Sequence, residues 1–139
     1  MRKIESVLIV GYGVMGQGVS KTFADAGFKT TVKSSRAMAL EGVPLGVTVT
    51  SDFPRETPDL IIEFVPEAVP TKQTVYAEIE AAYPDGDYLI ASGTSGLDLI
   101  ELAAKLEHPE RFIGLHYFMP ADKTQIGRAS CRDRVYSSV

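Results

Sequence analysis

Short apolar runs alternate with longer amphipathic segments along most of the chain. The strands predicted from the apolar runs cover residues 6–10, 28–33, 47–50, 60–65, 88–92 and 112–117. The helices predicted between them cover residues 15–26, 70–83 and 97–106, with a weak helical patch over 36–41. Because strands and helices alternate, the pattern favours an α/β fold with a doubly wound, mostly parallel sheet that is incomplete at the C-terminal end.

The first apolar run leads directly into the glycine loop, Gly11-Tyr12-Gly13-Val14-Met15-Gly16. G-x-G-x-x-G between a strand and a helix is typical of Rossmann-like dinucleotide-binding domains, although glycines also mark ordinary turns. The first glycine permits a sharp turn, the second leaves no Cβ between backbone and pyrophosphate, and the third allows close helix packing. The N–H groups that open the helix then hold the phosphates. The cofactor-binding residues predicted here are Gly11, Gly13, Val14, Met15 and Gly16.

Length, charge and cysteine content narrow the class of protein. The chain has 139 residues, enough for one domain with a core, and its net charge of −4 argues against a nucleic-acid partner. The start runs directly into the first strand and no apolar run is long enough to span a membrane, so we expect a cytoplasmic protein without a membrane partner. A single cysteine, Cys131, cannot form an internal disulfide, and no metal-ligand cluster is visible.

Three further segments complete a recognisable pattern: Glu67 with Lys72, residues 93–96 (Gly-Thr-Ser-Gly), and residues 114–120 (Gly-Leu-His-Tyr-Phe-Met-Pro). With the glycine loop, they make the chain resemble the N-terminal NAD-binding domain of the L-3-hydroxyacyl-CoA dehydrogenase family over about residues 7–120. The resemblance implies an oxidoreductase of fatty acid metabolism that interconverts a 3-hydroxyacyl thioester and its 3-keto form with NAD. It also implies homodimeric full-length members.

The resemblance assigns roles to four side chains. His116 is the catalytic base, Ser95 bonds the substrate oxygen near the nicotinamide, and Glu67 and Lys72 contact the cofactor. From the residues alone, His116 could instead be a structural histidine at a strand end, and Ser95 could cap a helix. Glu67 and Lys72 could be a solvated pair at the start of a helix. Glu63 is interpreted as a charge at a sheet edge or strand end.

The chain departs from the family pattern at three places. Ser34 stands where an acidic residue would bond the ribose 2′-hydroxyl, and Ser34-Ser35-Arg36 resembles a 2′-phosphate pocket, which favours NADP over NAD. Met119 stands where the family commonly has an asparagine. The acidic partner expected for the histidine falls at about Arg128.

After Pro120 the hydrophobic pattern fails, and residues 126–139 show neither helical nor strand periodicity. This tail resembles the translation of a sequencing-library adapter. We therefore expect residues 1–125 to be a partial dinucleotide-binding domain, residues 126–139 to be a non-native tail, and the family's C-terminal helical domain to be absent, which would leave this fragment inactive. The alternatives are a native basic tail, a dehydrogenase of a small hydroxy acid or carrier-bound hydroxyacyl group, and a stand-alone dinucleotide-binding module.

Overall fold

The computed structural model describes residues 3–117, 126–131 and 135–137, which form one sheet with helices on both faces. The first six strands and the first two α-helices begin and end within two residues of the predicted segments. In chain order the elements are β1 (Ser6–Val10), α1 (Val14–Asp25), β2 (Lys29–Lys33), the 3₁₀ turn η1 (Ala37–Ala39), β3 (Val47–Thr50), β4 (Leu60–Glu63), α2 (Val69–Ala82), β5 (Leu89–Ser92), α3 (Leu99–Ala103), the 3₁₀ turn η2 (Pro109–Arg111), β6 (Phe112–Tyr117), β7 (Ile126–Cys131) and β8 (Val135–Ser137).

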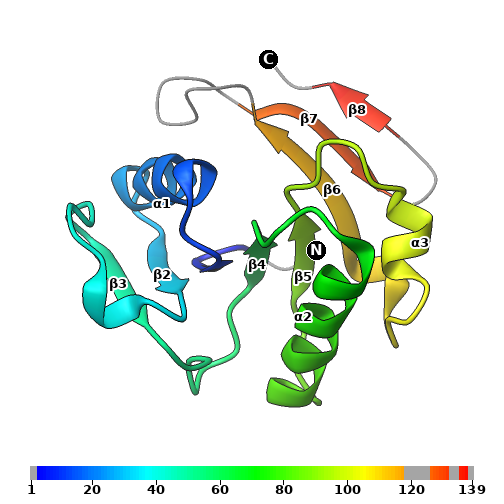
Figure 1. Cartoon of the computed structure of the whole chain (residues 1–139), viewed down its shortest axis with the longest axis horizontal. Coiled ribbons are helices and arrows are strands. Elements are labelled where there is room, and N and C mark those ends of the chain that lie inside the picture. The colour runs from blue at the N-terminus through cyan, green and yellow to red at the C-terminus, as the bar shows by residue number, and fades with distance from the viewer. Residues whose placement is uncertain (1–2, 118–125, 132–134, 138–139) are drawn as a thin grey trace.

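The sheet has the strand order β3-β2-β1-β4-β5-β6-β7-β8 (Figure 1). The pairs from β3 to β6 are all parallel, whereas β6–β7 and β7–β8 are antiparallel. The predicted doubly wound, mostly parallel sheet is therefore confirmed. The chain moves outward from β1 in one direction and then outward from β4 in the other, so the topology reverses between these two strands.

The central strand β1 is buried on both faces, as its apolar run predicts. Val7 and Ile9 pack with Val19 of α1 in one cluster, while Leu8 and Val10 belong to the cluster beneath α2. This division follows from the twofold alternation of side chains along a strand. Each fully buried aliphatic side chain contributes about 1.5–3 kcal/mol to the free energy of unfolding. The two clusters fix the positions of the helices that bound the site.

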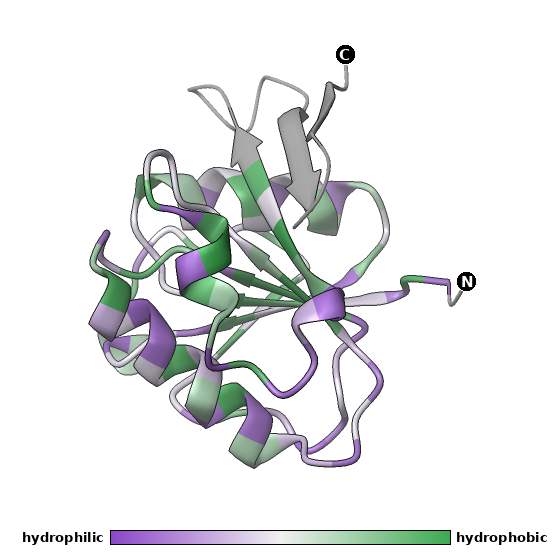
Figure 2. Cartoon of the chain, turned by 90° about the vertical axis from the view of Figure 1, so that its right-hand side faces the viewer, coloured by the Kyte–Doolittle hydropathy of each residue, from purple (hydrophilic) through white to green (hydrophobic). Residues whose placement is uncertain are grey.

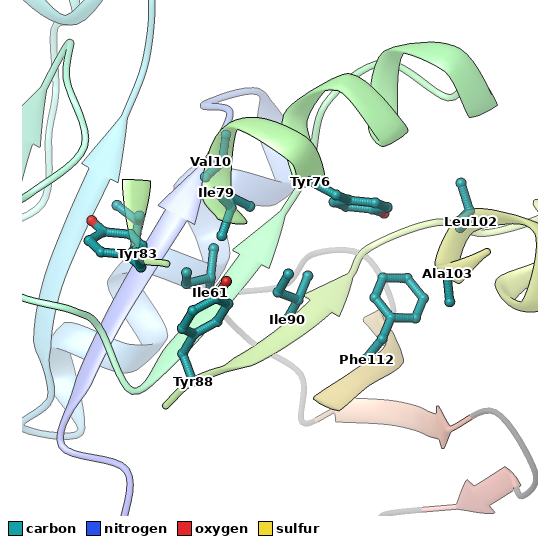
Figure 3. Close-up of a cluster of buried hydrophobic side chains, with 11 residues drawn as sticks. Val10, Ile61, Tyr76, Ile79, Tyr83, Tyr88, Ile90, Leu102, Ala103 and Phe112 are labelled. Atoms are coloured by element: carbon teal, nitrogen blue, oxygen red, sulfur yellow. The ribbon is translucent and has the colours of Figure 1, made fainter. Parts of the chain in front are cut away.

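The second cluster joins α2 and α3 to the sheet. Figure 3 shows their side chains facing Ile61, Ile90 and Phe112 of the strands. Figure 2 shows hydrophilic and hydrophobic bands alternating along the helices, as expected where only one face of a helix is buried. In the described part of the chain, no helix is long and apolar enough to cross a membrane.

Two predicted helices are shorter than the sequence pattern suggests. The patch over 36–41 is a single 3₁₀ turn, η1. The predicted helix 97–106 spans only Leu99–Ala103, because the Asp98 side chain accepts a hydrogen bond from the Ile100 N–H at 2.8 Å and so sets its start. At the other end, the Ala104 N–H donates to the Glu101 carbonyl, which tightens the last turn.

The segment after residue 125 forms two strands, although its sequence shows no strand periodicity. Ile126–Cys131 forms β7 against the outer edge of β6, and Val135–Ser137 forms β8 beside it. Strand pairing uses backbone N–H and C=O groups that nearly any sequence supplies, and without β7 that edge of β6 would be unpaired. Apolar alternation is therefore not required for such an edge strand.

Candidate functional site

The carboxyl ends of β1, β4 and β5 meet at one edge of the sheet, where the topology reverses. A cavity of about 280 Å³ lies there. It is lined by the start of α1 and by residues that follow β4 and β5: Gly13, Val14, Met15, Gly16, Phe64, Val65, Glu67, Lys72 and Gly93. Open α/β sheets bind their ligands in the crevice outside the carboxyl ends of the strands at such a reversal. Four of the five predicted residues of the glycine loop therefore line a crevice of the expected kind.

The three glycines of the loop meet different surroundings. Gly11 has φ +101°, and an added Cβ would lie 2.7 Å from the Phe64 carbonyl oxygen. An added Cβ on Gly16 would overlap the carbonyl of Gly11, so this glycine allows α1 to pack closely. At Gly13, by contrast, an added Cβ would meet no heavy atom within 4 Å. Gly13 therefore borders open space, as a position that receives a pyrophosphate requires.

The first turn of α1 is suited to an anion. Gly13 is the N-cap residue, and among the described residues no side chain caps this end or places an acid in the first turn. The first N–H groups of a helix have no acceptor within the helix, and the helix dipole favours negative charge there. The backbone of Val14, Met15 and Gly16 therefore fits the phosphates of a dinucleotide.

Glu63 is the last residue of β4, so its interpretation as a charge at a strand end is confirmed, whereas a sheet edge is wrong because β4 lies between β1 and β5 and the side chain is fully buried. It lies at the end of β4 in the middle of the sheet, where Lys72 forms an ion pair with its Oε1. Its Oε2 accepts hydrogen bonds of 2.7 Å from the hydroxyls of Tyr76 and Ser92. The carboxylate is tolerated in the core because each of its oxygens has charged or polar partners.

Tyr76 and Ser92 are members of this network that sequence reasoning missed. Burial, followed by the neighbouring Glu63 carboxylate, raises the pKa of Tyr76 above its ordinary value, so its hydroxyl remains a donor. The signal in the sequence is the helical spacing of Lys72, Tyr76 and Ile79, which places all three on the face of α2 that packs on the sheet.

Lys72 is 1% exposed, so the interpretation of Glu67 and Lys72 as a solvated pair is wrong for the lysine. In addition to pairing with Glu63, its Nζ donates to the Val65 carbonyl at 3.0 Å. Glu67 Oε1 is farther away, at 3.5 Å. The ammonium group thus lies between a buried and a half-exposed carboxylate, and it is bound more closely by the buried one.

Glu67 organises the loop after β5. Its Oε1 accepts a hydrogen bond from the Thr94 hydroxyl at 2.7 Å, and its Oε2 accepts from the backbone N–H of Ser95 at 2.9 Å and from the Ser95 hydroxyl at 3.1 Å. Partial burial alone would raise the pKa of Glu67, but these hydrogen bonds and the Lys72 charge together lower it from 4.5 to about 2. Glu67 is therefore ionised at neutral pH.

The Ser95 side chain does not cap α3, since Asp98 does so. Ser95 is instead held beside the cavity by Glu67, which leaves its hydroxyl oxygen able to accept a further hydrogen bond. Thr94, which the sequence analysis did not single out, completes the connection by also accepting from the Leu97 N–H at 3.1 Å.

Ser34 and Arg36 lie at the carboxyl end of β2, on the other side of β1 from Glu67. The Ser34 hydroxyl oxygen accepts a hydrogen bond from the Arg36 N–H at 3.1 Å, which closes a tight turn. Arg36 itself is exposed. The two residues are therefore placed on the half of the crevice where a doubly wound domain receives the adenosine ribose.

His116 is a residue of β6, two positions beyond Gly114, which pairs with Ser92. It therefore lies toward the same edge of the sheet as the loop that carries Ser95. Its register partner on β7 is Arg128, the residue that stands where the family has an acid. Met119 lies outside the described residues.

The strand order, the loop geometry and the cavity together define a dinucleotide-binding domain of the Rossmann type. In the described part of the chain, no group of three histidine, cysteine or carboxylate side chains is placed to hold a metal ion. Comparison with known proteins gives a narrower class. The model of the family "3-hydroxyacyl-CoA dehydrogenase, NAD binding domain" matches residues 43–126. The chain belongs to this family, which supports NAD as its cofactor.

Individual relatives agree with the family. A probable 3-hydroxyacyl-CoA dehydrogenase of Caenorhabditis elegans is 29% identical, with 86% of this chain and 49% of the relative covered. The 5-formyl-3-hydroxy-2-methylpyridine 4-carboxylate 5-dehydrogenase of Mesorhizobium japonicum is 30% identical over 84% of this chain and 45% of its own length. The solved structure of M. tuberculosis FadB2 is 29% identical with a TM-score of 0.74, covering 86% of this chain and 51% of that one. The chain spans about half the length of the curated relatives it matches.

Proposed function

We propose that this chain carries the dinucleotide-binding half of an enzyme that interconverts a 3-hydroxyacyl-CoA and a 3-ketoacyl-CoA with NAD. The observation that carries the proposal is that the glycine loop and Glu67 line one cavity and that Glu67 holds Ser95 by a hydrogen bond, in a chain of the 3-hydroxyacyl-CoA dehydrogenase family. An acyl thioester is the proposed substrate. When bound, NAD supplies the acceptor for the hydride that leaves the hydroxyl-bearing carbon.

Two side chains have proposed roles in the reaction itself. His116 removes the proton from the substrate hydroxyl, for which an imidazole is suited near neutral pH. Ser95 hydrogen-bonds the substrate oxygen. Since a serine has one hydroxyl hydrogen, donation to a keto oxygen requires the Ser95 hydroxyl to leave Glu67, whereas its oxygen can accept from a substrate hydroxyl without that change.

The experiment that tests this function has two parts. The chain is first titrated with NADH, followed by fluorescence, and we expect saturable binding. The protein expressed from the native locus is then assayed for reduction of acetoacetyl-CoA with NADH, beside its Ser95→Ala and His116→Gln variants. We expect turnover that falls by at least about 100-fold in the histidine variant. Turnover that is unchanged in both variants would refute the assigned roles.

A second candidate is a dehydrogenase that acts on a small hydroxy compound and not on a thioester. It is favoured by the Mesorhizobium relative, whose name describes a pyridine carboxylate substrate, and by Ser34 and Met119, which depart from the common family pattern. The same assay separates the two candidates, because activity with small hydroxy acids and none with acetoacetyl-CoA would favour the second.

The proposal includes the domain boundaries, with the dinucleotide-binding domain at residues 1–125 and a non-native segment at 126–139. Its support is that the family match ends at residue 126. Arg128, the register partner of His116, stands in place of the expected acid, which also agrees with a foreign segment. Sequencing the native locus tests this point, and native codons that continue from Gln125 into this tail would refute it.

A further inference from the structure

The charged side chains of Glu63, Glu67 and Lys72 lie together where β4 and β5 end. Lys72 is bound more closely by Glu63 than by Glu67. Glu63 and Lys72 are 0% and 1% exposed and form a direct ion pair. Apart from the more distant Glu67, the other partners of this pair are neutral: Tyr76 and Ser92 donate to Glu63, and the Val65 carbonyl accepts from Lys72. The pair is therefore neutral as a unit and is closed off inside the protein.

Glu67 is the charge that remains. Its side chain is 40% exposed, and Lys72 is 3.5 Å away, farther than the distance of a close ion pair. Its nearer partners, Thr94 and Ser95, are uncharged donors that hold the carboxylate in place without neutralising it. The three charged groups together therefore carry one net negative charge, and Glu67 presents that charge at the surface.

The net charge faces the cavity. Glu67 and Lys72 are the only charged side chains among the described residues that line it, and Gly13 to Gly16 border its other side. A dinucleotide that crosses a doubly wound sheet puts its pyrophosphate at the glycine loop and extends its two halves to either side of the reversal. Since Ser34 and Arg36 occupy the β2 side, the β4–β5 side with Glu67 is left for the nicotinamide half.

We propose that Glu67, left uncompensated because Glu63 neutralises Lys72, makes this site favour the oxidised cofactor over the reduced one. The nicotinamide ring carries a positive charge in NAD⁺ and none in NADH, while the phosphates of the two forms are the same. A fixed negative charge beside the ring therefore stabilises bound NAD⁺ selectively. The consequence on the enzyme is that bound NADH becomes a stronger hydride donor to the keto substrate, since that hydride transfer forms the favoured NAD⁺. This inference rests on the proposed dinucleotide binding.

The test is the ratio of the dissociation constants of NAD⁺ and NADH, measured by calorimetry on the whole chain. Glu67→Gln removes the charge and keeps a side chain of the same shape, and it is expected to raise the ratio Kd(NAD⁺)/Kd(NADH) by about fivefold, the effect of a unit charge about 4 Å away in water. The control is Glu56→Gln, which removes an exposed carboxylate paired with Lys29 outside the cavity and is expected to leave the ratio unchanged.

A second variant separates charge from local structure. Glu63→Gln leaves Glu67 in place but frees the charge of Lys72, so it is expected to raise the same ratio. For the unmodified chain, the ratio is also expected to rise between 0.01 M and 1 M salt, as the screening length falls from about 30 Å to about 3 Å. A ratio unaffected by Glu67→Gln and by salt, with both cofactor forms still bound, would overturn this inference alone. Failure of both forms to bind would overturn the proposed function as well.

Discussion

Replacing Gly13 with alanine separates the cofactor-binding role of the glycine loop from its structural role. No heavy atom lies within 4 Å of the added Cβ, and the φ of −92° is one that alanine adopts readily. Alanine is a poorer N-cap than glycine by about 0.5–1 kcal/mol. It also loses about 0.4–1 kcal/mol less backbone entropy on folding. Because these effects offset each other, we expect the free energy of unfolding to change by about 0.5 kcal/mol or less.

In contrast to this small effect on stability, Gly13→Ala is expected to weaken cofactor binding strongly. The new methyl group occupies the space in which the pyrophosphate approaches the first turn of α1, and a lost hydrogen bond to a charged group costs about 1.5–3 kcal/mol. The dissociation constant for NADH should therefore rise by about 10- to 100-fold. Fluorescence titration measures the constant, and urea unfolding measures stability on the same samples. Unchanged NADH affinity in a folded variant would refute the assignment of this cavity.

Gly11→Ala is the matched comparison within the same loop. Its φ of +101° strains an alanine by about 1–3 kcal/mol. The added Cβ would also press on the Phe64 carbonyl oxygen, 2.7 Å away, at a further cost of about 1–3 kcal/mol. Urea unfolding should show a destabilisation of about 2–6 kcal/mol. A variant as stable as the wild type would contradict the described loop geometry.

Three further changes test other parts of the site. Lys72→Met leaves Glu63 buried without a counterion and should lower the free energy of unfolding by about 3–5 kcal/mol. The exposed control Lys29→Met should lower it by about 0.5 kcal/mol or less, and equal losses would contradict a buried ion pair. Arg36→Asp should shift the NADH/NADPH affinity ratio toward NADH by about tenfold, measured by fluorescence, and an unchanged ratio defeats the 2′-phosphate argument. Glu67 has its pKa lowered from 4.5 to about 2, so its ionisation stabilises the fold fully above pH 4.5 and this contribution is lost as the pH falls toward 2. The stability difference between wild type and Glu67→Gln in urea titrations should shrink over that interval, and a constant difference would exclude this role.

The fold and the cavity were predictable because their signals are local. The apolar run of β1, the glycine spacing and the regular alternation of strands and helices each depend on neighbouring residues, and together they specify the doubly wound sheet. That Glu67 and Ser95 belong to one site was predictable only through the family resemblance, since no local rule connects two residues 28 positions apart.

The burial of Glu63 and its ion pair with Lys72 could not be predicted from its own segment. A single charge within an apolar strand is compatible with an edge, a strand end or a buried pair, and the choice depends on partners contributed by α2 and β5. The strands of the tail were not predicted for a related reason, since β7 is held by backbone pairing to β6 and not by a side-chain pattern. Both features depend on long-range contacts that hydrophobic periodicity does not encode.

The central claim is that a dinucleotide binds across the carboxyl ends of β1 and β4. An amide ¹H–¹⁵N spectrum of the whole chain, recorded during titration with NADH, tests this claim residue by residue. We predict saturable shifts that concentrate in the glycine loop, in residues 64–67 and in residues 93–95. No saturable shifts in the folded chain, or shifts confined to the amino ends of the strands around Ser6 and Lys29, would contradict it.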